Sequence, residues 1–227
     1  MSEVTYGVDL GRMEYLAALE LQHRAVAARQ EGRVPDLLLL VEHDPVITLG
    51  RRGDARHVLA APEALEQAGI ALHTVERGGD VTYHGPGQLV GYPIAKLAEH
   101  GLGAADYMHR LEDLLLAVVA DFGLAGRRRD GIIGVWLGPD KVAALGARIE
   151  RGVSYHGFAL NVNTDLSHFG LIIPCGIADG GVTSLSQALG GPVDWALALA
   201  RVEARFAQLF HTRLEALNPE DLERLVR

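Results

Sequence analysis

The stretch Arg77-Gly78-Gly79-Asp80-Val81-Thr82-Tyr83-His84-Gly85-Pro86-Gly87-Gln88-Leu89-Val90-Gly91-Tyr92-Pro93 is the most unusual part of this chain, because it holds five glycines and two prolines. Glycine allows backbone geometries that other residues avoid and leaves amide groups exposed, so this loop can approach a ligand closely. Arg77 and His84 would flank the resulting pocket. The alternative is an ordinary glycine-rich turn with a hydrogen-bonded histidine. The glycine spacing matches neither a P-loop nor a dinucleotide fingerprint, so it does not predict a phosphate site.

Outward from this stretch, hydrophobic periodicity and turn residues predict alternating helices and strands. Apolar residues at helical spacing predict helices over residues 13–30, 61–68, 104–122, 193–210 and 219–226. Short apolar or alternating runs predict strands over residues 37–41, 46–49, 72–75, 81–83, 131–137, 141–149, 157–161 and 171–173. These elements indicate an α/β chain in which the second half supplies much of the sheet.

Length and composition favour one globular enzyme-sized domain over residues 1–227. Hydrophobic residues make up 48% and charged residues 22%, which argues against a disordered, coiled-coil or fibrous protein. The net charge of −8 disfavours nucleic-acid binding, although Arg51-Arg52 and Arg127-Arg128-Arg129 are local basic clusters that are either solvated or in contact with an acidic partner.

Targeting signals are not evident in the sequence. The first ten residues lack the features of a cleaved leader, and the apolar run over residues 37–41 is too short to cross a membrane. A single cysteine cannot form an internal disulfide, so nothing indicates an oxidising compartment. We therefore expect a soluble, cytoplasmic protein.

Cys175 is the only cysteine, and Lys96 and Lys141 are the only lysines among 21 basic residues. A thiolate is a nucleophile whose pKa falls beside an ammonium group, and lysine, unlike arginine, can act as a base. The pair therefore suggests acyl transfer. A buried structural cysteine and a solvated lysine are the alternatives. Pro174 and Gly176 place Cys175 in a loop, which favours a functional role, and Lys96 is expected at the surface.

Two further segments suggest a pocket. Small side chains follow Lys141 in Val142-Ala143-Ala144-Leu145-Gly146-Ala147, where an acyl chain or peptide can lie close to the strand. The segment Gly152-Val153-Ser154-Tyr155-His156-Gly157-Phe158-Ala159-Leu160-Asn161-Val162-Asn163 mixes glycine, histidine and asparagine as strands that line a site often do, although a satisfied core histidine is equally common. The histidine spacing fits no zinc motif, so we expect no metal.

Three blocks in this order resemble the lipoyl(octanoyl) transferase family, and they lie within residues 36–190. They are Arg77-Gly78-Gly79 with Thr82-Tyr83-His84-Gly85-Pro86-Gly87-Gln88, then Lys141-Val142-Ala143-Ala144-Leu145-Gly146, then Pro174-Cys175-Gly176 with Gly181-Val182-Thr183-Ser184-Leu185. The resemblance implies a mixed, largely antiparallel sheet flanked by helices, as in the catalytic domain of biotin and lipoate ligases.

The resemblance also implies an activity and its residues. Family members move an octanoyl or lipoyl group from acyl carrier protein to a lysine of lipoyl domains, those of 2-oxoacid dehydrogenases and the glycine cleavage H protein, as the first step of protein lipoylation. Cys175 matches the acyl-accepting nucleophile and Lys141 the lysine that lowers its pKa, and no cofactor is implied. The substrate-binding positions fall on Arg77, Gly78, Gly79, Asp80, Val81, Thr82, Tyr83, His84, Ala144, Leu145, Gly146, Gly157, Phe158 and Ala159.

Two other functions remain open at this point. An ATP-dependent lipoate or biotin protein ligase would share the implied fold and a similar glycine-rich stretch, but it needs no nucleophilic cysteine. A non-catalytic protein that binds an acyl carrier or a lipoyl domain would leave Cys175 merely packed. Turnover, and its dependence on ATP, distinguishes the three.

Overall fold

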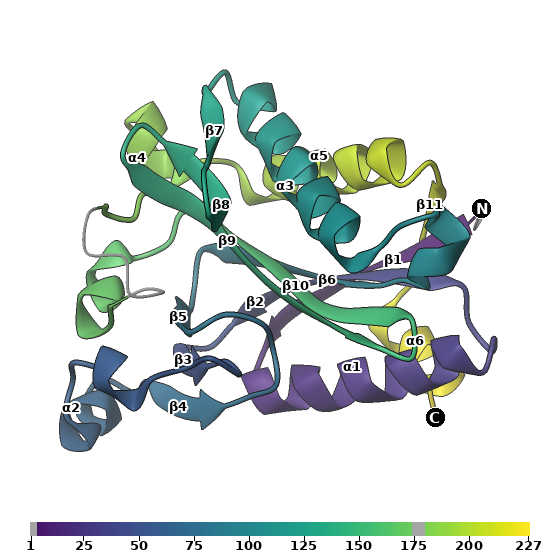
Figure 1. Cartoon of the computed structure of the whole chain (residues 1–227), viewed down its shortest axis with the longest axis horizontal. Helices are drawn as coiled ribbons and strands as arrows, with labels where there is room; N and C mark the ends of the chain where they lie inside the picture. The colour runs from purple at the N-terminus through teal and green to yellow at the C-terminus, as the bar shows by residue number, and fades with distance from the viewer. Residues whose placement is uncertain (1–3, 174–179) are drawn as a thin grey trace.

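The computed structural model describes residues 4–173 and 180–227, and the strands of this part form an eight-stranded and a three-stranded sheet (Figure 1). The larger sheet has the order β11-β1-β2-β6-β10-β9-β8-β7. Its strands are β1 (Val4–Met13), β2 (Asp36–His43), β6 (Gln88–Ile94), β7 (Gly126–Arg129), β8 (Ile132–Leu137), β9 (Asp140–Glu150), β10 (Val153–Asn161) and β11 (Arg213–Ala216). Only the pairs β11–β1 and β1–β2 are parallel among these described strands. The prediction of a mixed, largely antiparallel sheet is confirmed.

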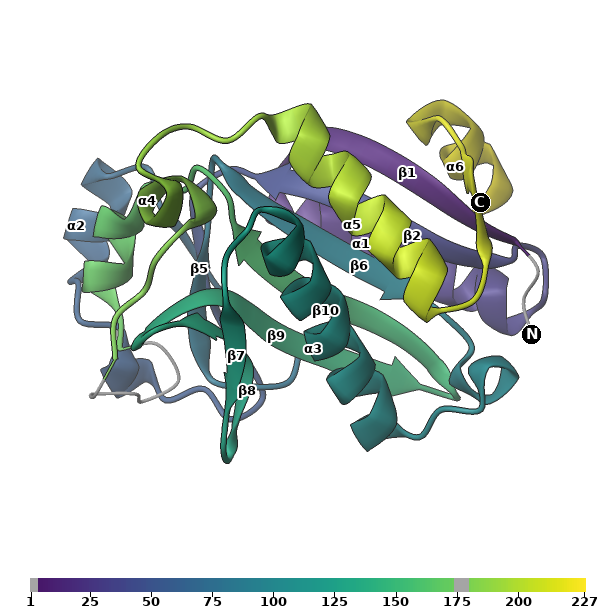
Figure 2. The same cartoon turned by 90° about the horizontal axis from the view of Figure 1, so that it is seen from above.

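Helices cover both faces of the large sheet (Figures 1 and 2). On one face, α3 (Ala104–Asp121) and α5 (Trp195–Leu209) bury an apolar layer, and on the other face lie α1 (Tyr15–Gln30) and α6 (Pro219–Leu225). Because β2 is covered on both sides, its residues Leu37 to Leu40 are all fully buried and form a continuous apolar run. In the described parts of the chain, no helix is both long and apolar enough to cross a membrane.

The three-stranded sheet lies beside one end of the large sheet, next to α2 (Figure 1). Its order is β4-β3-β5, and β5 runs antiparallel to β3. The bounds here are β3 (Val46–Leu49), β4 (Ala71–Thr74), β5 (Val81–His84) and α2 (Pro62–Gln67). Short helices complete the chain at η1 (Ala55–His57), η2 (Leu97–His100), η3 (Leu166–Leu171) and α4 (Leu185–Leu189).

One predicted strand is wrong. Residues 171–173 do not form a strand: Leu171 ends the 3-10 helix η3, and Ile172 makes only an isolated bridge to Val58. Ile172 is apolar because it packs into the core of the small sheet together with Ile47 and Phe169. The short apolar run thus correctly indicated that these residues are buried, but burial alone does not specify a strand.

Four strands of the large sheet were not predicted: β1, β6, β7 and β11. Strand β6 is the instructive case, because Gly91 and Pro93 made its sequence look like a loop. A Cβ on Gly91 would lie 2.2 Å from Cζ of Phe158, so the glycine lets a ring of the neighbouring strand lie across it. The residue that argued against a strand is thus required by the packing of that strand.

Candidate active site

Lys141 lies near the start of β9 and is 7% exposed. Its Nζ sits 4.8 Å from the ring centroid of Trp136, a cation–π geometry. Its backbone N–H donates to the carbonyl of Gly181 at 3.0 Å, and its carbonyl accepts from the N–H of Thr183 at 2.9 Å. The segment that follows the Pro174-Cys175-Gly176 block is therefore held alongside Lys141.

The segment that precedes this block is also fixed. The N–H of Ile173 donates to the carbonyl of His57 at 2.8 Å, and Ile172 bridges to Val58. Cys175 itself lies outside the described residues. Whether Cys175 and Lys141 touch therefore stays a prediction.

A chain of buried amides runs from this region into the protein. The Nδ2 of Asn161 donates to the carbonyl of Thr183 at 2.9 Å, and the Nε2 of Gln88 donates to Oδ1 of Asn161 at 2.9 Å. The Oε1 of Gln88 then accepts from Nδ1 of His84 at 2.7 Å. Neither Gln88 nor Asn161 was predicted as a site residue, although both fall inside the segments that the sequence singled out.

Two hollows follow one another along this wall. The first lies next to Lys141 and is also lined by Gln88, Ala143 and Asn161. The second is lined by Gly146, Gly157, His84 and Tyr92 among others. Both are lined by Thr82, Ala144 and Ala159. We call the two together the channel.

Most predicted substrate-binding residues line the second hollow. They are Arg77, Gly79, Thr82 and His84 from the glycine-rich stretch, Ala144, Leu145 and Gly146 from β9, and Gly157, Phe158 and Ala159 from β10. The two strands pair with Gly146 opposite Gly157 and Ala144 opposite Ala159. A Cβ on Gly146 would lie 2.7 Å from the carbonyl oxygen of Gly78, so this glycine lets the loop lie flat on the sheet.

Four predicted residues lie elsewhere. Val81 and Tyr83 are in the core of the small sheet, because side chains alternate along β5. Asp80 joins the loop to its neighbour: its carboxylate accepts from the N–H of Asp54 at 3.0 Å and lies 2.5 Å from Nδ1 of His57. Gly78 donates its N–H to the carbonyl of Ala147 at 3.2 Å. Their contribution is to the shape of the loop rather than to the wall of the second hollow.

Arg77 is buried, and its hydrogen bonds hold the glycine-rich loop in place. Its guanidinium donates to Oγ1 and to the carbonyl of Thr48, at 3.0 Å and 2.6 Å. It also donates to the carbonyls of Asp80 and Gly78, at 2.6 Å and 2.9 Å. Five N–H donors in a fixed plane suit this task, which lysine cannot perform in the same way.

In addition to Arg77, the second hollow, which Lys141 does not line, has a polar part without charged side chains. We call it the polar end, and it consists of Tyr15, His84, Tyr92 and His156. Burial lowers the pKa of both His84 and His156 to about 3, so both imidazoles are neutral at physiological pH. Burial also raises the pKa of the Tyr15 and Tyr92 hydroxyls. Of these four residues, only His84 was predicted as a site residue.

A third histidine stands behind the polar end. Nδ1 of His43 donates to the carbonyl of Met13 at 2.9 Å, which leaves Nε2 to accept from the Tyr92 hydroxyl at 2.7 Å. Burial lowers the pKa of His43 to about 4. The ring of Tyr15 contacts both His43 and His84, with centroids 5.1 Å and 5.8 Å apart.

Comparisons with known proteins identify the family of this chain. The family described as the lipoyl protein ligase A/B catalytic domain matches residues 14–207. An octanoyltransferase from Alkaliphilus metalliredigens is 46% identical over 205 residues, 90% of this chain and 94% of the relative. One from Syntrophobacter fumaroxidans is 46% identical over 219 residues, 96% of each chain. The chain belongs to the octanoyltransferase family. It is therefore an acyltransferase.

Solved structures share the family's fold. A bipartite lipoate protein ligase from Thermoplasma acidophilum superposes with a TM-score of 0.75 at 15% identity, over 99% of this chain and 91% of that one. The biotin protein ligase from Aquifex aeolicus superposes with a TM-score of 0.52 at 13% identity, over 93% of this chain and 70% of that one. The predicted likeness to biotin and lipoate ligase catalytic domains is confirmed as a likeness of fold.

Proposed function

We propose that this protein transfers an octanoyl group from acyl carrier protein to a specific lysine of lipoyl domains, through a thioester on Cys175. The observation that carries the proposal is the channel: two adjoining hollows with small-residue walls lead to Lys141, in a member of the octanoyltransferase family. An acyl chain fits such walls, because Ala144, Gly146 and Ala159 leave room beside the strands.

The first step forms the acyl-enzyme. The Cys175 thiolate attacks the carbonyl carbon of the octanoyl thioester on the carrier, and the bond from that carbon to the carrier sulfur breaks. The departing sulfur takes up a proton from Lys141. The buried position of Lys141 over Trp136 and its ties to Gly181 and Thr183 support this role, because they fix the lysine beside the segment that follows Cys175.

The second step forms the amide. The amine of the acceptor lysine attacks the Cys175 thioester, the carbon–sulfur bond breaks, and Lys141 accepts a proton from the incoming amine. A thioester is a higher-energy acyl donor than the amide product, so this step needs no ATP. The thiol must stay reduced between turnovers, which supports a cytoplasmic location.

The test is intact-mass analysis after the protein is mixed with octanoyl-acyl carrier protein, first alone and then with a lipoyl domain, in the absence of ATP. We expect an octanoyl adduct on the protein that moves to the domain. Cys175→Ala should form no adduct. Transfer by Cys175→Ala, or transfer that demands ATP, would overturn the mechanism in favour of a ligase. Tight binding of either partner without turnover would indicate a binding protein.

Lys141 has a matched control in the same chain. Lys141→Arg keeps the positive charge but removes the base, so the transfer rate should fall by about 10²–10⁴-fold. Lys96→Arg makes the same change at the other lysine, whose side chain is 44% exposed and pairs with Glu99 at 3.4 Å. We expect wild-type rates from Lys96→Arg. Near-normal rates from Lys141→Arg would eliminate it as the proton relay.

A further inference from the structure

His156 occupies a backbone conformation that few non-glycine residues adopt, with a φ of 51°. Side chains alternate between the faces of a regular strand, but this φ breaks the alternation in β10. Tyr155 faces α1, where its ring lies 5.6 Å from that of His23. His156 stacks on Tyr155 and also contacts Tyr92, with centroids 4.9 Å and 6.3 Å apart. The unusual conformation thus turns the imidazole into the channel.

The imidazole of His156 is buried there without a hydrogen-bond partner. The residue is 1% exposed, and neither Nδ1 nor Nε2 is hydrogen-bonded to any residue that the structure describes. The neighbouring buried histidines differ, because His84 bonds to Gln88 and His43 bonds to Met13 and Tyr92. Unpaired buried polar groups and strained backbone are both unfavourable, and together at one position they indicate a functional contact.

The strand registers place His156 at the end of the channel away from Lys141. In the β9–β10 ladder, Leu160 pairs with Ala143 beside Lys141, and His156 pairs with Ala147. Four residues of strand separate the two levels, which is about 13 Å. Strand β6 gives the same direction, because Gln88 lines the hollow next to Lys141 and Tyr92 lines the other.

In the proposed function the acyl chain is attached beside Lys141, so its terminal carbon points along the channel toward the polar end. An octanoyl chain ends in a methyl group, which can hydrogen-bond to neither nitrogen of His156. A hydroxyl group on that carbon can do so.

We propose that His156 binds a hydroxyl group on the terminal carbon of the acyl chain, so that ω-hydroxyoctanoyl thioesters are substrates as well as octanoyl ones. This inference rests on the proposed octanoyl transfer. A neutral imidazole has one donor and one acceptor, and a hydroxyl can satisfy either. An apolar channel end would discriminate against the added hydroxyl by about 10²-fold. The imidazole removes that discrimination.

The experiment measures the rate of acyl-enzyme formation by intact mass, with S-octanoyl-pantetheine and S-(8-hydroxyoctanoyl)-pantetheine as donors. For the wild-type protein we expect the two rates to agree within about tenfold. For His156→Phe we expect the ratio of the hydroxyoctanoyl rate to the octanoyl rate to fall by about 10²-fold. A wild-type preference for octanoyl of about 10²-fold, or an unchanged ratio in His156→Phe, overturns the inference.

His211 provides the matched control. It also has a φ of 51° but is exposed and does not line the second hollow, so His211→Phe makes the same change on the same backbone conformation. We expect its donor ratio to equal that of the wild type. If His156→Phe does not fold, His156→Asn replaces it, because asparagine tolerates this conformation. Asparagine is shorter than histidine and should not reach the hydroxyl group, so the ratio of the hydroxyoctanoyl rate to the octanoyl rate should still fall.

The two proposals fail in different ways. If octanoyl-pantetheine acylates the wild-type protein and the hydroxylated donor does not, only the inference about His156 is wrong. If neither pantetheine donor nor octanoyl-acyl carrier protein acylates it, the proposed function is wrong, and the inference that rests on it falls as well.

Discussion

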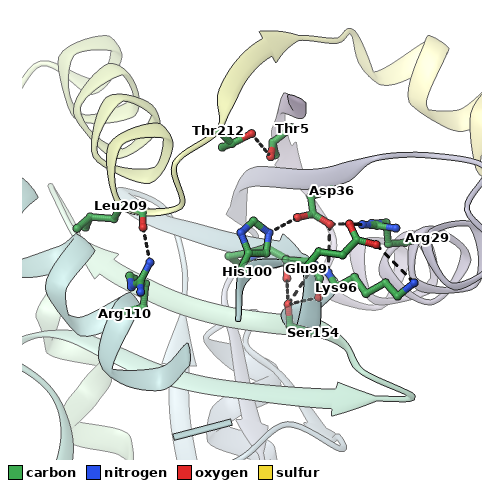
Figure 3. Close-up of polar contacts among 12 residues, drawn as sticks. Thr5, Arg29, Asp36, Lys96, Glu99, His100, Arg110, Ser154, Leu209 and Thr212 are labelled. Atoms are coloured by element: carbon green, nitrogen blue, oxygen red, sulfur yellow. Dashed lines mark hydrogen bonds and ion pairs between the residues drawn. The ribbon is translucent and has the colours of Figure 1, made fainter. Parts of the chain in front are cut away.

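The two ends of β2 bury polar side chains in contrasting ways. At its first residue, Asp36 accepts from Nε of Arg29 at 2.7 Å, from Nε2 of His100 at 2.5 Å and from the N–H of Lys96 at 3.1 Å (Figure 3). The carboxylate of Glu99 accepts a hydrogen bond from Nη2 of Arg29. We call Arg29, Asp36, Glu99 and His100 the ionic cluster. At its last residue, His43 backs the polar end of the channel, where the imidazole of His156 has no hydrogen bond within the described residues.

The ionic cluster and the polar end therefore have different roles, one in stabilising the fold and the other in the channel. The ionic cluster joins the end of α1, the start of β2 and helix η2, and its arginine and two carboxylates are in contact with an opposite charge. The polar end instead keeps its histidines neutral, and its His156 has a positive φ and an imidazole without a hydrogen bond to any described residue. A fully paired buried cluster supports the fold, whereas an incompletely paired one awaits a ligand.

The largest expected effect is at the ionic cluster. Asp36→Ala leaves Arg29 and His100 without their shared carboxylate, so the free energy of unfolding should fall by about 3–5 kcal/mol. Urea denaturation measures the loss. Asp44→Ala is the matched control, because Asp44 pairs with Arg12 at the surface and both side chains are 53% exposed. That pair is worth at most about 1 kcal/mol, so equal losses from the two variants would contradict the comparison.

Acid pH should destabilise the protein through the buried histidines at the polar end and behind it. The folded-state pKa values of His43, His84 and His156, about 4, 3 and 3, lie below the unfolded value of 6.5. Below pH 6.5 the unfolded chain therefore binds more protons than the folded protein. The free energy of unfolding then falls by about 1.4 kcal/mol for each histidine with each unit by which the pH is lowered. Urea midpoints between pH 6.5 and 5 test this slope. His156→Phe should reduce it by one histidine's share, and an unchanged slope would mean that His156 is not held neutral.

The smallest expected effect is on stability at pH 8. His156→Phe replaces an imidazole that makes no hydrogen bond with any described residue by a ring of similar shape. Removing an unsatisfied polar group recovers its desolvation cost, which offsets the imperfect packing of the new ring and the cost of a positive φ at phenylalanine, so the free energy of unfolding should change by less than about 1 kcal/mol. A loss of 3 kcal/mol or more would show that the imidazole supports the fold after all, as the ionic cluster does.

The sequence predicted those parts of the fold whose signals are local. The helices over residues 104–122 and 193–210 are confirmed as α3 and α5, because their apolar residues repeat at helical spacing. Strand β6 was missed because Gly91 is favourable only beneath Phe158, a residue of another strand. Likewise β1 forms by pairing with β2 and β11, and the residue pattern of β1 alone does not predict this pairing.

For the site, the sequence by itself determined which three segments are candidates, and it predicted the chemistry that they would supply. The scarce lysine, the single cysteine and the glycine-rich stretch identified a candidate Cys–Lys pair and an acyl pocket, because residue type fixes what a side chain can do. Only the tertiary structure decided which side chains face the channel. In the sequence, His156 is equally consistent with a satisfied core histidine and with a pocket residue. Its burial without a hydrogen bond to any described residue is visible only in the packing of β10, β6 and α1. A hydrogen-bond partner is a property of the surroundings, and those surroundings come from distant parts of the chain.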